Sequence, residues 1–166
     1  MNLALAALVA TCAPAVHPTT MLALIAVESA GNPYAVSVNH PAALRAAGIA
    51  VPEYAQPRSL PEARARLAAL SARGYSSSVG LAQINAERLG TWRLAPEALL
   101  DPCVNLALAQ RVLLECEAAL RGPRRSTASL LSCFNSGDAT TGIANGYAAR
   151  VMRAAIHLRS SSIVTE

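Results

Sequence analysis

Residues 18–33 read PTTMLALIAVESAGNP, and this stretch predicts both the class of the fold and the place where its chemistry lies. Proline suits the first turn of a helix, and Gly31-Asn32-Pro33 is a turn signal, so we predict a helix over residues 18–29. The helix leads directly into a loop, and loops next to rigid elements are where binding clefts form.

Glu28 lies on the apolar side of this predicted helix. At about 100° per residue, Met21, Leu24 and Ile25 define one face, and Glu28 falls near its centre. A carboxylate on a buried face is costly as an anion, so its pKa should rise until it holds a proton near neutrality. A general acid needs that property. Two other interpretations stay open: pairing with a buried arginine, or a solvated position just beyond the helix end.

The rest of the chain predicts one compact, mainly helical domain. Its 166 residues are 53% hydrophobic but only 4% aromatic, with an excess of alanine and leucine, which are strong helix formers. A capping box at Ser59 and Glu62, and Asp101 as an N-cap, mark two helix starts. Four prolines keep residues 31–58 from forming a long helix, and residues 74–85 suit a short strand or turn. Further helices are predicted over residues 3–11, 61–73, 102–120, 127–135 and 146–159.

The charge pattern excludes some classes of partner. The net charge is +4 and the pI about 9.2, which fits an ordinary surface or attraction to a polyanion such as the acidic cell wall. The basic residues are scattered, with only Arg124 and Arg125 adjacent, so nucleic-acid binding is not supported. No run reaches the roughly 20 apolar residues of a membrane-spanning helix. Residues 1–13 lack a basic start, so we expect the first helix of a mature domain whose export signal is absent from this chain.

Four cysteines are widely spaced, at positions 12, 103, 116 and 133. No pair has the CxxC spacing of a zinc or redox site and no histidine lies near one, so we expect no metal. The even count suits two disulfides in an oxidising compartment. Four buried free thiols are the other interpretation.

Residues 78–85, SVGLAQIN, combine small, apolar and amide side chains. Gly80 would let a ligand approach the backbone closely, and the amides of Gln83 and Asn85 suit the recognition of acetamido and hydroxyl groups. The same pattern also fits a buried edge strand whose polar groups are satisfied within the fold.

Five ordered motifs resemble those of the soluble lytic transglycosylases (glycoside hydrolase family 23). The first two are Glu28-Ser29-x-x-Asn32-Pro33-x-x-x-Ser37 and Gly80-Leu81-x-Gln83-Ile84. The remaining three are similar to the specialised branch of type IV secretion and conjugation systems: Asp101-Pro102-Cys103-x-Asn105-Leu106, Ser132-Cys133-Phe134-Asn135-Ser136-Gly137 and Asn145-Gly146-Tyr147-x-x-x-Val151. The resemblance covers residues 3–151.

This resemblance implies an α+β, lysozyme-like fold. We expect a mainly α, single compact helical domain over residues 1–159, with a substrate cleft and at most a short β-hairpin, and a polar C-terminal tail over residues 160–166. The implied reaction cleaves the β-1,4 bond between N-acetylmuramic acid and N-acetylglucosamine to give 1,6-anhydromuropeptides, with no cofactor or metal. Glu28 aligns with the sole acid/base of the family. The implied substrate-binding residues are Ser37, Ser78, Gly80, Gln83, Asn85, Asn135 and Tyr147.

The resemblance also implies partners, location and disulfide pairing. The expected partners are the glycan strands of peptidoglycan and components of a type IV secretion apparatus, for which the protein would open the wall locally. We expect a periplasmic or exported monomer without a transmembrane segment. The cysteine positions of the secretion branch favour the pairs Cys12–Cys103 and Cys116–Cys133.

Three departures from the family pattern keep other functions open. Ala82 stands where methionine is usual, Phe134 stands where tyrosine is common, and residues 38–76 are longer than in the broad family. A catalytically silent peptidoglycan-binding assembly subunit fits these departures. A hydrolytic lysozyme of the same fold would need a second carboxylate, such as Asp101 or Asp138, facing Glu28. A secreted helical interaction protein without a sugar site is the fourth interpretation.

Overall fold

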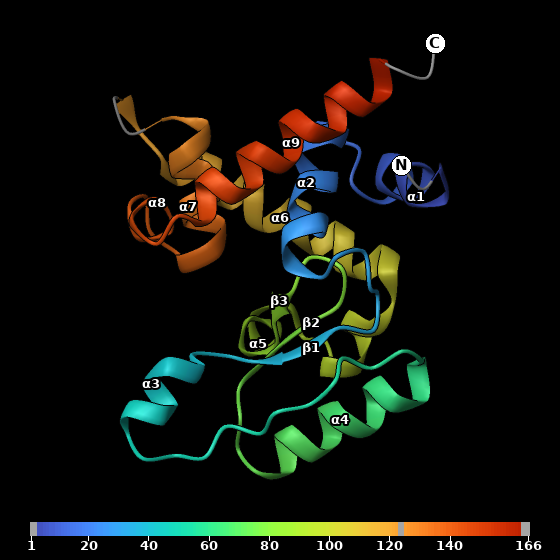
Figure 1. Cartoon of the computed structure of the whole chain (residues 1–166), viewed down its shortest axis with the longest axis vertical. Helices are drawn as coiled ribbons and strands as arrows, with labels where there is room; N and C mark the ends of the chain where they lie inside the picture. The colour runs from blue at the N-terminus through green and yellow to red at the C-terminus, as the bar shows by residue number, and fades with distance from the viewer. Residues whose placement is uncertain (1–2, 123–124, 164–166) are drawn as a thin grey trace. The chain divides into compact units, whose positions relative to one another are not determined.

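The computed structural model describes residues 3–122 and 125–163, which fold into two compact units (Figure 1). Unit 1 comprises Met1–Gly31 and Leu106–Glu166, and unit 2 comprises Asn32–Asn105. Helices dominate, and unit 2 carries one small antiparallel sheet. The predicted class, mainly α with a small β component, is confirmed.

Unit 1 is built around α2 (Pro18–Glu28) and α9 (Tyr147–Ile163), which pack against each other and cross in Figure 1. The apolar face predicted for α2 is the buried one, since Met21, Leu24 and Ile25 are 0–1% exposed. Burying three such side chains stabilises the unit by several kcal/mol, at about 1.5–3 kcal/mol each. The remaining elements of the unit are α1 (Leu3–Cys12), α6 (Pro102–Ala119) from Leu106 onward, α7 (Thr127–Ser136) and α8 (Thr141–Ala144).

The helix ends lie within a few residues of the predicted ones, except at the C-terminus. There α9 continues to Ile163, four residues beyond the predicted end at Arg159. The serine-rich segment is compatible with helix because Ser160 Oγ donates to the Ile156 carbonyl at 3.2 Å. Residues 160–163 of the predicted tail thus continue the helix, and residues 164–166 lie outside the described part of the chain.

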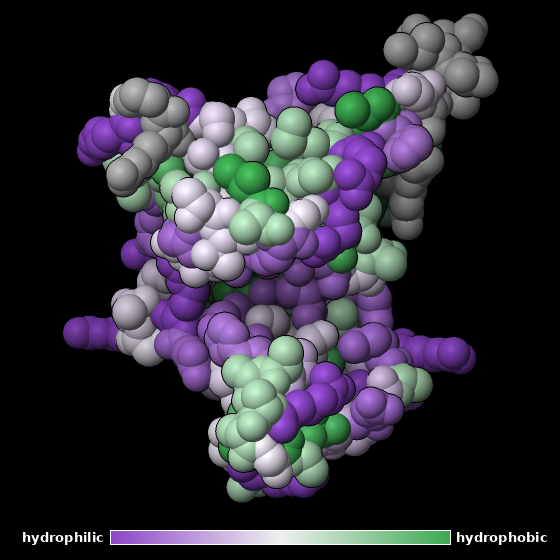
Figure 2. Space-filling model, turned by 60° about the vertical axis from the view of Figure 1, so that its left-hand side comes forward, coloured by the Kyte–Doolittle hydropathy of each residue, from purple (hydrophilic) through white to green (hydrophobic). Residues whose placement is uncertain are grey.

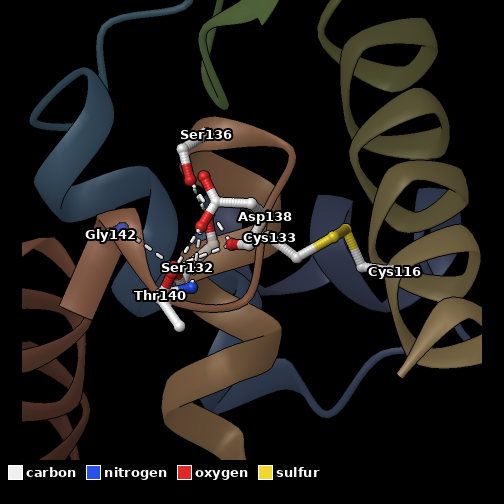
Figure 3. The surroundings of a disulfide bond; sticks show 7 residues. All are labelled: Cys116, Ser132, Cys133, Ser136, Asp138, Thr140 and Gly142. Carbon is white, nitrogen blue, oxygen red and sulfur yellow. Dashed lines mark hydrogen bonds between the residues drawn. A yellow bond between two sulfur atoms is a disulfide. The ribbon is translucent and has the colours of Figure 1, made fainter. Parts of the chain in front are cut away.

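A disulfide joins α6 to α7 in unit 1 (Figure 3). Cys116 and Cys133 have their Cα atoms 5.8 Å apart, within the normal range for a bridge. This pair confirms one of the two predicted pairings. Cys12 and Cys103 are also disulfide-bonded, and the part of the chain described contains no free cysteine, so the alternative of free thiols is wrong.

Unit 2 contains a three-stranded sheet in the order β1-β2-β3, formed by β1 (Val36–Val38), β2 (Ser77–Val79) and β3 (Ile84–Asn85). The strands β2 and β3 form the predicted hairpin. The strand β1 was not predicted, because its three residues Val-Ser-Val lie within a proline-rich segment and are too few to show alternation. The helix α4 (Leu60–Ala72) contacts β1 and β2 of this sheet and buries Ala63, Leu67 and Leu70.

The predicted helix caps in unit 2 are present. Ser59 Oγ accepts from the Glu62 amide at 3.4 Å at the start of α4. The Glu62 carboxylate in turn accepts from the Arg58 amide at 2.9 Å. This bond, followed by a hydrogen bond between the Ser59 side chain and the carboxylate, lowers the pKa of this exposed group. Asp101 Oδ1 accepts from the Val104 amide at 2.9 Å and so caps α6. These local signals fix where the two helices begin.

The other elements of unit 2 are short surface pieces. One of them, α3 (Pro41–Ala46), buries no residue and was not predicted, although the four prolines of residues 31–58 argued only against a long helix. Figure 2 shows apolar surface near the tip formed by this helix and the segment after it, where Ile49 is 44% exposed. The remaining elements are η1 (Ala86–Arg88), α5 (Leu89–Trp92) and η2 (Pro96–Leu100).

Candidate active site

Glu28 is the last residue of α2, and both the capped start of this helix and its burial in the core determine where the side chain lies. The His17 side chain caps the helix by accepting from the Thr19 amide at 3.2 Å, and Pro18 occupies the first turn. This start sets the phase of the helix, so that Glu28 follows the fully buried Leu24 by one turn. The carboxyl is consequently half-buried on the apolar face, as predicted.

The environment of Glu28 favours its protonated form. Burial raises the pKa of Glu28 to about 7, although a hydrogen bond from Tyr147 and the positive charge of Arg150 both act to lower it. In the described part of the chain no arginine forms an ion pair with Glu28, so the interpretation as a buried ion pair is not supported. A carboxyl with a pKa near neutrality can give a proton and take one back at the same pH.

Tyr147 is the direct partner of Glu28. Its hydroxyl donates to Glu28 Oε1 from the first turn of α9, 119 residues away in sequence. The phenol is only 3% exposed, and burial followed by the adjacent Glu28 charge raises the pKa of Tyr147, so the hydroxyl keeps its proton. One carboxyl oxygen is therefore oriented by the tyrosine, which leaves Oε2 for proton transfer.

A short polar network holds Tyr147 in place. Asn145 Oδ1 accepts from the Tyr147 amide at 2.9 Å, and Asn145 Nδ2 donates to Asn135 Oδ1 at 3.2 Å. Gly146, which lies between Asn145 and Tyr147 in the chain, has φ +78°, a conformation that glycine adopts without strain. Glu28, Tyr147 and Asn135, three of the predicted site residues, are thus linked by hydrogen bonds within unit 1. Asn145 is an addition, although it belongs to the same sequence motif as Tyr147.

Arg150 was also missed by sequence reasoning. Its guanidinium lies 5.8 Å from the centre of the Tyr147 ring and donates to the Asn145 carbonyl at 3.3 Å. Its spacing of three residues from Tyr147 on a helix would have placed the two on one face. Its charge counteracts part of the burial effect on the pKa of Glu28.

The two carboxylates considered as partners for a hydrolytic mechanism have structural roles. Asp138 Oδ1 accepts from the amide of Thr140 at 2.8 Å (Figure 3) and from the amide of Thr141 at 2.8 Å. These bonds, chiefly those from Thr141, lower the pKa of Asp138. Asp101 is the cap of α6. Both are exposed, whereas Glu28 is half-buried.

In unit 2 the sheet aligns three of the predicted residues. Ser37 pairs with Ser78 across β1 and β2, and Ser78 pairs with Asn85 across β2 and β3. Directly opposed residues point to the same side of a sheet, so these side chains form one polar row. Asn39 and Ser76 extend the row: Ser78 Oγ donates to Asn39 Oδ1 and Asn39 Nδ2 donates to Ser76 Oγ, both at 2.6 Å. The opposite side carries Val79 and Ile84 and is buried.

Packing requires a glycine at position 80. Its φ is +82°, and a Cβ at this position would lie 2.2 Å from Asn105 Nδ2 and 2.7 Å from the Leu99 carbonyl oxygen. The space predicted to admit a ligand is on that side filled by Asn105. This asparagine is fully buried, donates to the carbonyls of Val79 and Leu99 at 2.8 and 3.0 Å, and accepts from the Ala82 amide at 2.8 Å.

Gln83 shares this internal role. It has φ +48°, which is uncommon for a residue other than glycine, and its Nε2 donates to the carbonyls of Ala35 at 3.1 Å and Gly80 at 3.0 Å. Both amide hydrogens are therefore used inside the fold, so contact with a ligand would fall to Oε1. The interpretation of this segment as internally satisfied is correct for Gly80 and for the donors of Gln83.

The departures from the family pattern leave these contacts intact. Ala82 is fully buried and contributes through its backbone amide to Asn105. Phe134 is half-buried in α7, beside the Asn135 that reaches the Tyr147 network. Within the described ranges no three histidine, cysteine, aspartate or glutamate side chains cluster as metal ligands would. A search of the same ranges finds no helix long and apolar enough to cross a membrane.

Comparison with known proteins gives a consistent set of relatives. Residues 6–156 match the family described as Transglycosylase SLT domain. The chain is 35% identical over 136 residues to the type IV secretion system protein virB1 of Brucella suis biovar 1, which covers 79% of this chain and 53% of that protein. It is 34% identical over 150 residues to protein virB1 of Agrobacterium fabrum, covering 89% and 57%. The chain thus spans about half the length of these curated relatives, and no solved structure matches it.

Proposed function

The chain belongs to the transglycosylase SLT domain family, and from this premise we propose that it is a lytic transglycosylase of peptidoglycan with Glu28 as its sole acid/base. The substrate bond is the β-1,4 linkage between N-acetylmuramic acid and N-acetylglucosamine, and the product is a 1,6-anhydromuropeptide. The observation that carries the proposal is a single half-buried carboxyl whose pKa is raised to about 7 and whose Oε1 is held by Tyr147.

In the first step protonated Glu28 gives its proton to the glycosidic oxygen as the bond from that oxygen to C1 of muramic acid breaks. The substrate's own acetamido group stabilises the oxocarbenium-like centre that forms at C1. Because burial raises the pKa of Glu28 to about 7, a protonated population is present at neutral pH. Tyr147 remains bonded to Oε1, so the proton leaves from Oε2.

In the second step the Glu28 carboxylate takes the proton from the 6-hydroxyl of the same muramic acid. The 6-oxygen attacks C1 and closes the anhydro ring, and Glu28 is restored to its protonated form without consuming water. General acid and base catalysis contributes about 10²–10⁴-fold, so substrate positioning must supply much of the rest. We assign that positioning to the predicted substrate-binding residues. The polar row of Ser37, Ser78 and Asn85 supports this assignment in unit 2.

The relatives named for type IV secretion support a place for this activity. We propose that the protein acts in the periplasm, where it opens the wall locally during assembly of a secretion or conjugation apparatus. Its partners would be glycan strands and components of that apparatus, and it would act as a monomer without a cofactor.

The deciding experiment incubates the purified, oxidised chain with peptidoglycan sacculi and identifies the soluble products by mass spectrometry. Glu28→Gln is the test variant, and Glu97→Gln, which changes an exposed glutamate, is the matched control. We expect 1,6-anhydromuramic ends from the wild type and the control, and none from Glu28→Gln. Reducing ends would instead assign a hydrolytic lysozyme. Binding of sacculi without release would assign an assembly subunit.

A further inference from the structure

Arg66 lies on the buried side of a helix, where a positive charge needs a partner. In α4 the buried residues are Ala63, Leu67 and Leu70, and Arg66 falls on the same stripe, three residues after Ala63 and four before Leu70. Arg64, two residues earlier, is exposed. The arginine is therefore directed inward by the helical period, as Glu28 is in unit 1.

The guanidinium of Arg66 is incompletely satisfied. Its Nη1 atom is buried and has no hydrogen-bond partner among the residues that the structure describes. The guanidinium stacks over the ring of Tyr54 at 4.4 Å from the centroid, a contact that supports the charge but supplies no acceptor. A buried donor without an acceptor costs stability, so this position calls for an acceptor from outside the chain.

Arg66 lines a pocket of about 240 Å³ within unit 2. Its walls include the apolar side chains of Val36, Pro52 and Leu70, with Tyr54 and Gln56 as polar neighbours. The volume is below the roughly 300–1,000 Å³ of pockets for whole drug-sized ligands, so it suits one amino-acid-sized group. The pocket draws most of its lining from residues 38–76, the segment that is longer than in the broad family.

Two carboxylates near Arg66 are engaged elsewhere. Glu53 also lines the pocket, but its side chain is 87% exposed and lies 3.6 Å from Arg45. The charge of Arg66 contributes to lowering the pKa of Glu62, but the Glu62 carboxylate accepts its hydrogen bond from the Arg58 amide. Neither supplies the missing acceptor at Nη1. The pocket therefore combines apolar walls with the half-buried Arg66 guanidinium, whose Nη1 atom is buried, and the exposed Glu53 carboxylate.

We propose that this pocket binds a free carboxylate of the peptide carried by muramic acid, with Arg66 as its anchor. The peptide offers small apolar side chains next to carboxylates, which match the walls and the charge of the pocket. This inference rests on the proposed function for the identity of its ligand. It adds a specificity element, by which peptide-bearing glycan is preferred to glycan without peptides.

The test measures binding directly and does not require activity. The ¹⁵N-labelled chain is titrated with the tripeptide L-Ala-γ-D-Glu-diaminopimelate, and the side-chain Nε–Hε signal of Arg66 and the amide signals of β1 are followed by NMR. The same peptide with every carboxylate converted to a carboxamide, and acetate alone, are the comparison ligands. Arg66→Gln is the test variant and Arg64→Gln the matched control on the exposed side of α4.

We expect the free peptide to bind the wild type and Arg64→Gln alike, and to bind Arg66→Gln at least about tenfold more weakly, as loss of a charged hydrogen bond implies. Equal binding of the amidated peptide, acetate binding as tight as that of the peptide, or unchanged affinity of Arg66→Gln would each overturn the proposal. In Arg66→Gln no hydrogen bond of Nη1 is lost and only the stacking on Tyr54 disappears, so its Tm should fall little. A marked drop would assign Arg66 a structural role instead. Absence of product release from sacculi by the wild type would refute the proposed function, while this titration would still decide the role of the pocket.

Discussion

Replacing Glu28 with glutamine should make the protein more stable at neutral and alkaline pH. Glutamine keeps the size of the side chain and the oxygen that accepts from Tyr147, but it cannot ionise. The pKa of Glu28 is raised from 4.5 to about 7 by burial. The folded state therefore binds this proton more tightly than the unfolded state does, and ionisation of Glu28 destabilises the fold.

The size and the pH window of this effect follow from linkage. The stabilising contribution of the protonated carboxyl is complete below about pH 4.5, declines as pH rises, and is lost above about pH 7. The gap between the two pKa values corresponds to about 3 kcal/mol at about 1.4 kcal/mol for each tenfold change. Glu28→Gln should therefore match the wild type near pH 4.5 and exceed its free energy of unfolding by up to about 3 kcal/mol at pH 8.

Urea unfolding of both proteins, with the disulfides oxidised, measures this difference at intervals between pH 4.5 and 8.5. Glu97→Gln controls for the loss of an exposed carboxylate and should show no such rise. Equal m-values in each pair keep the comparison two-state. A difference that stays flat with pH, or a wild type that is the more stable protein at pH 8, would refute the burial argument and with it the acid role of Glu28.

Three further predictions follow from other contacts. Tyr147→Phe removes a hydrogen bond that lowers the pKa of the catalytic carboxyl. The alkaline midpoint of the pH profile of kcat/KM, expected near pH 7 in the wild type, should therefore rise by about one pH unit or more. The control Tyr75→Phe removes an exposed hydroxyl and should leave this midpoint unchanged. Asn105→Ala should lower the free energy of unfolding by about 3 kcal/mol, because it removes three buried hydrogen bonds, and a loss under 1 kcal/mol would show that the segment relaxes without them. Serine at both positions of the Cys116–Cys133 bridge, which closes a loop of 17 residues, should cost about 3 kcal/mol in urea unfolding; no change in the midpoint would contradict this.

Local patterns were sufficient for the longer helices and for the environment of Glu28. The period of α2 placed that carboxyl among Met21, Leu24 and Ile25 without knowledge of what covers them, because a helix fixes the direction of each side chain from its neighbours. The caps at Ser59 and Asp101 were equally readable, since a cap and the amide it accepts from lie within three residues. The C-terminal end of α9 was misplaced because serines interrupt the apolar period there.

Sequence patterns alone thus predict a mainly helical protein with one acid on a buried face. The groups that shift the pKa of this acid are known only from the folded chain, because Tyr147 and Glu28 are 119 residues apart and no local signal sets their contact. The tertiary structure also decided that Ser37, Ser78 and Asn85 share a row, which depends on the register of three very short strands. The need for glycine at position 80 also follows only from packing, because a Cβ there would clash with Asn105. In the same way, only packing between distant segments leaves the buried Nη1 atom of Arg66 without an acceptor.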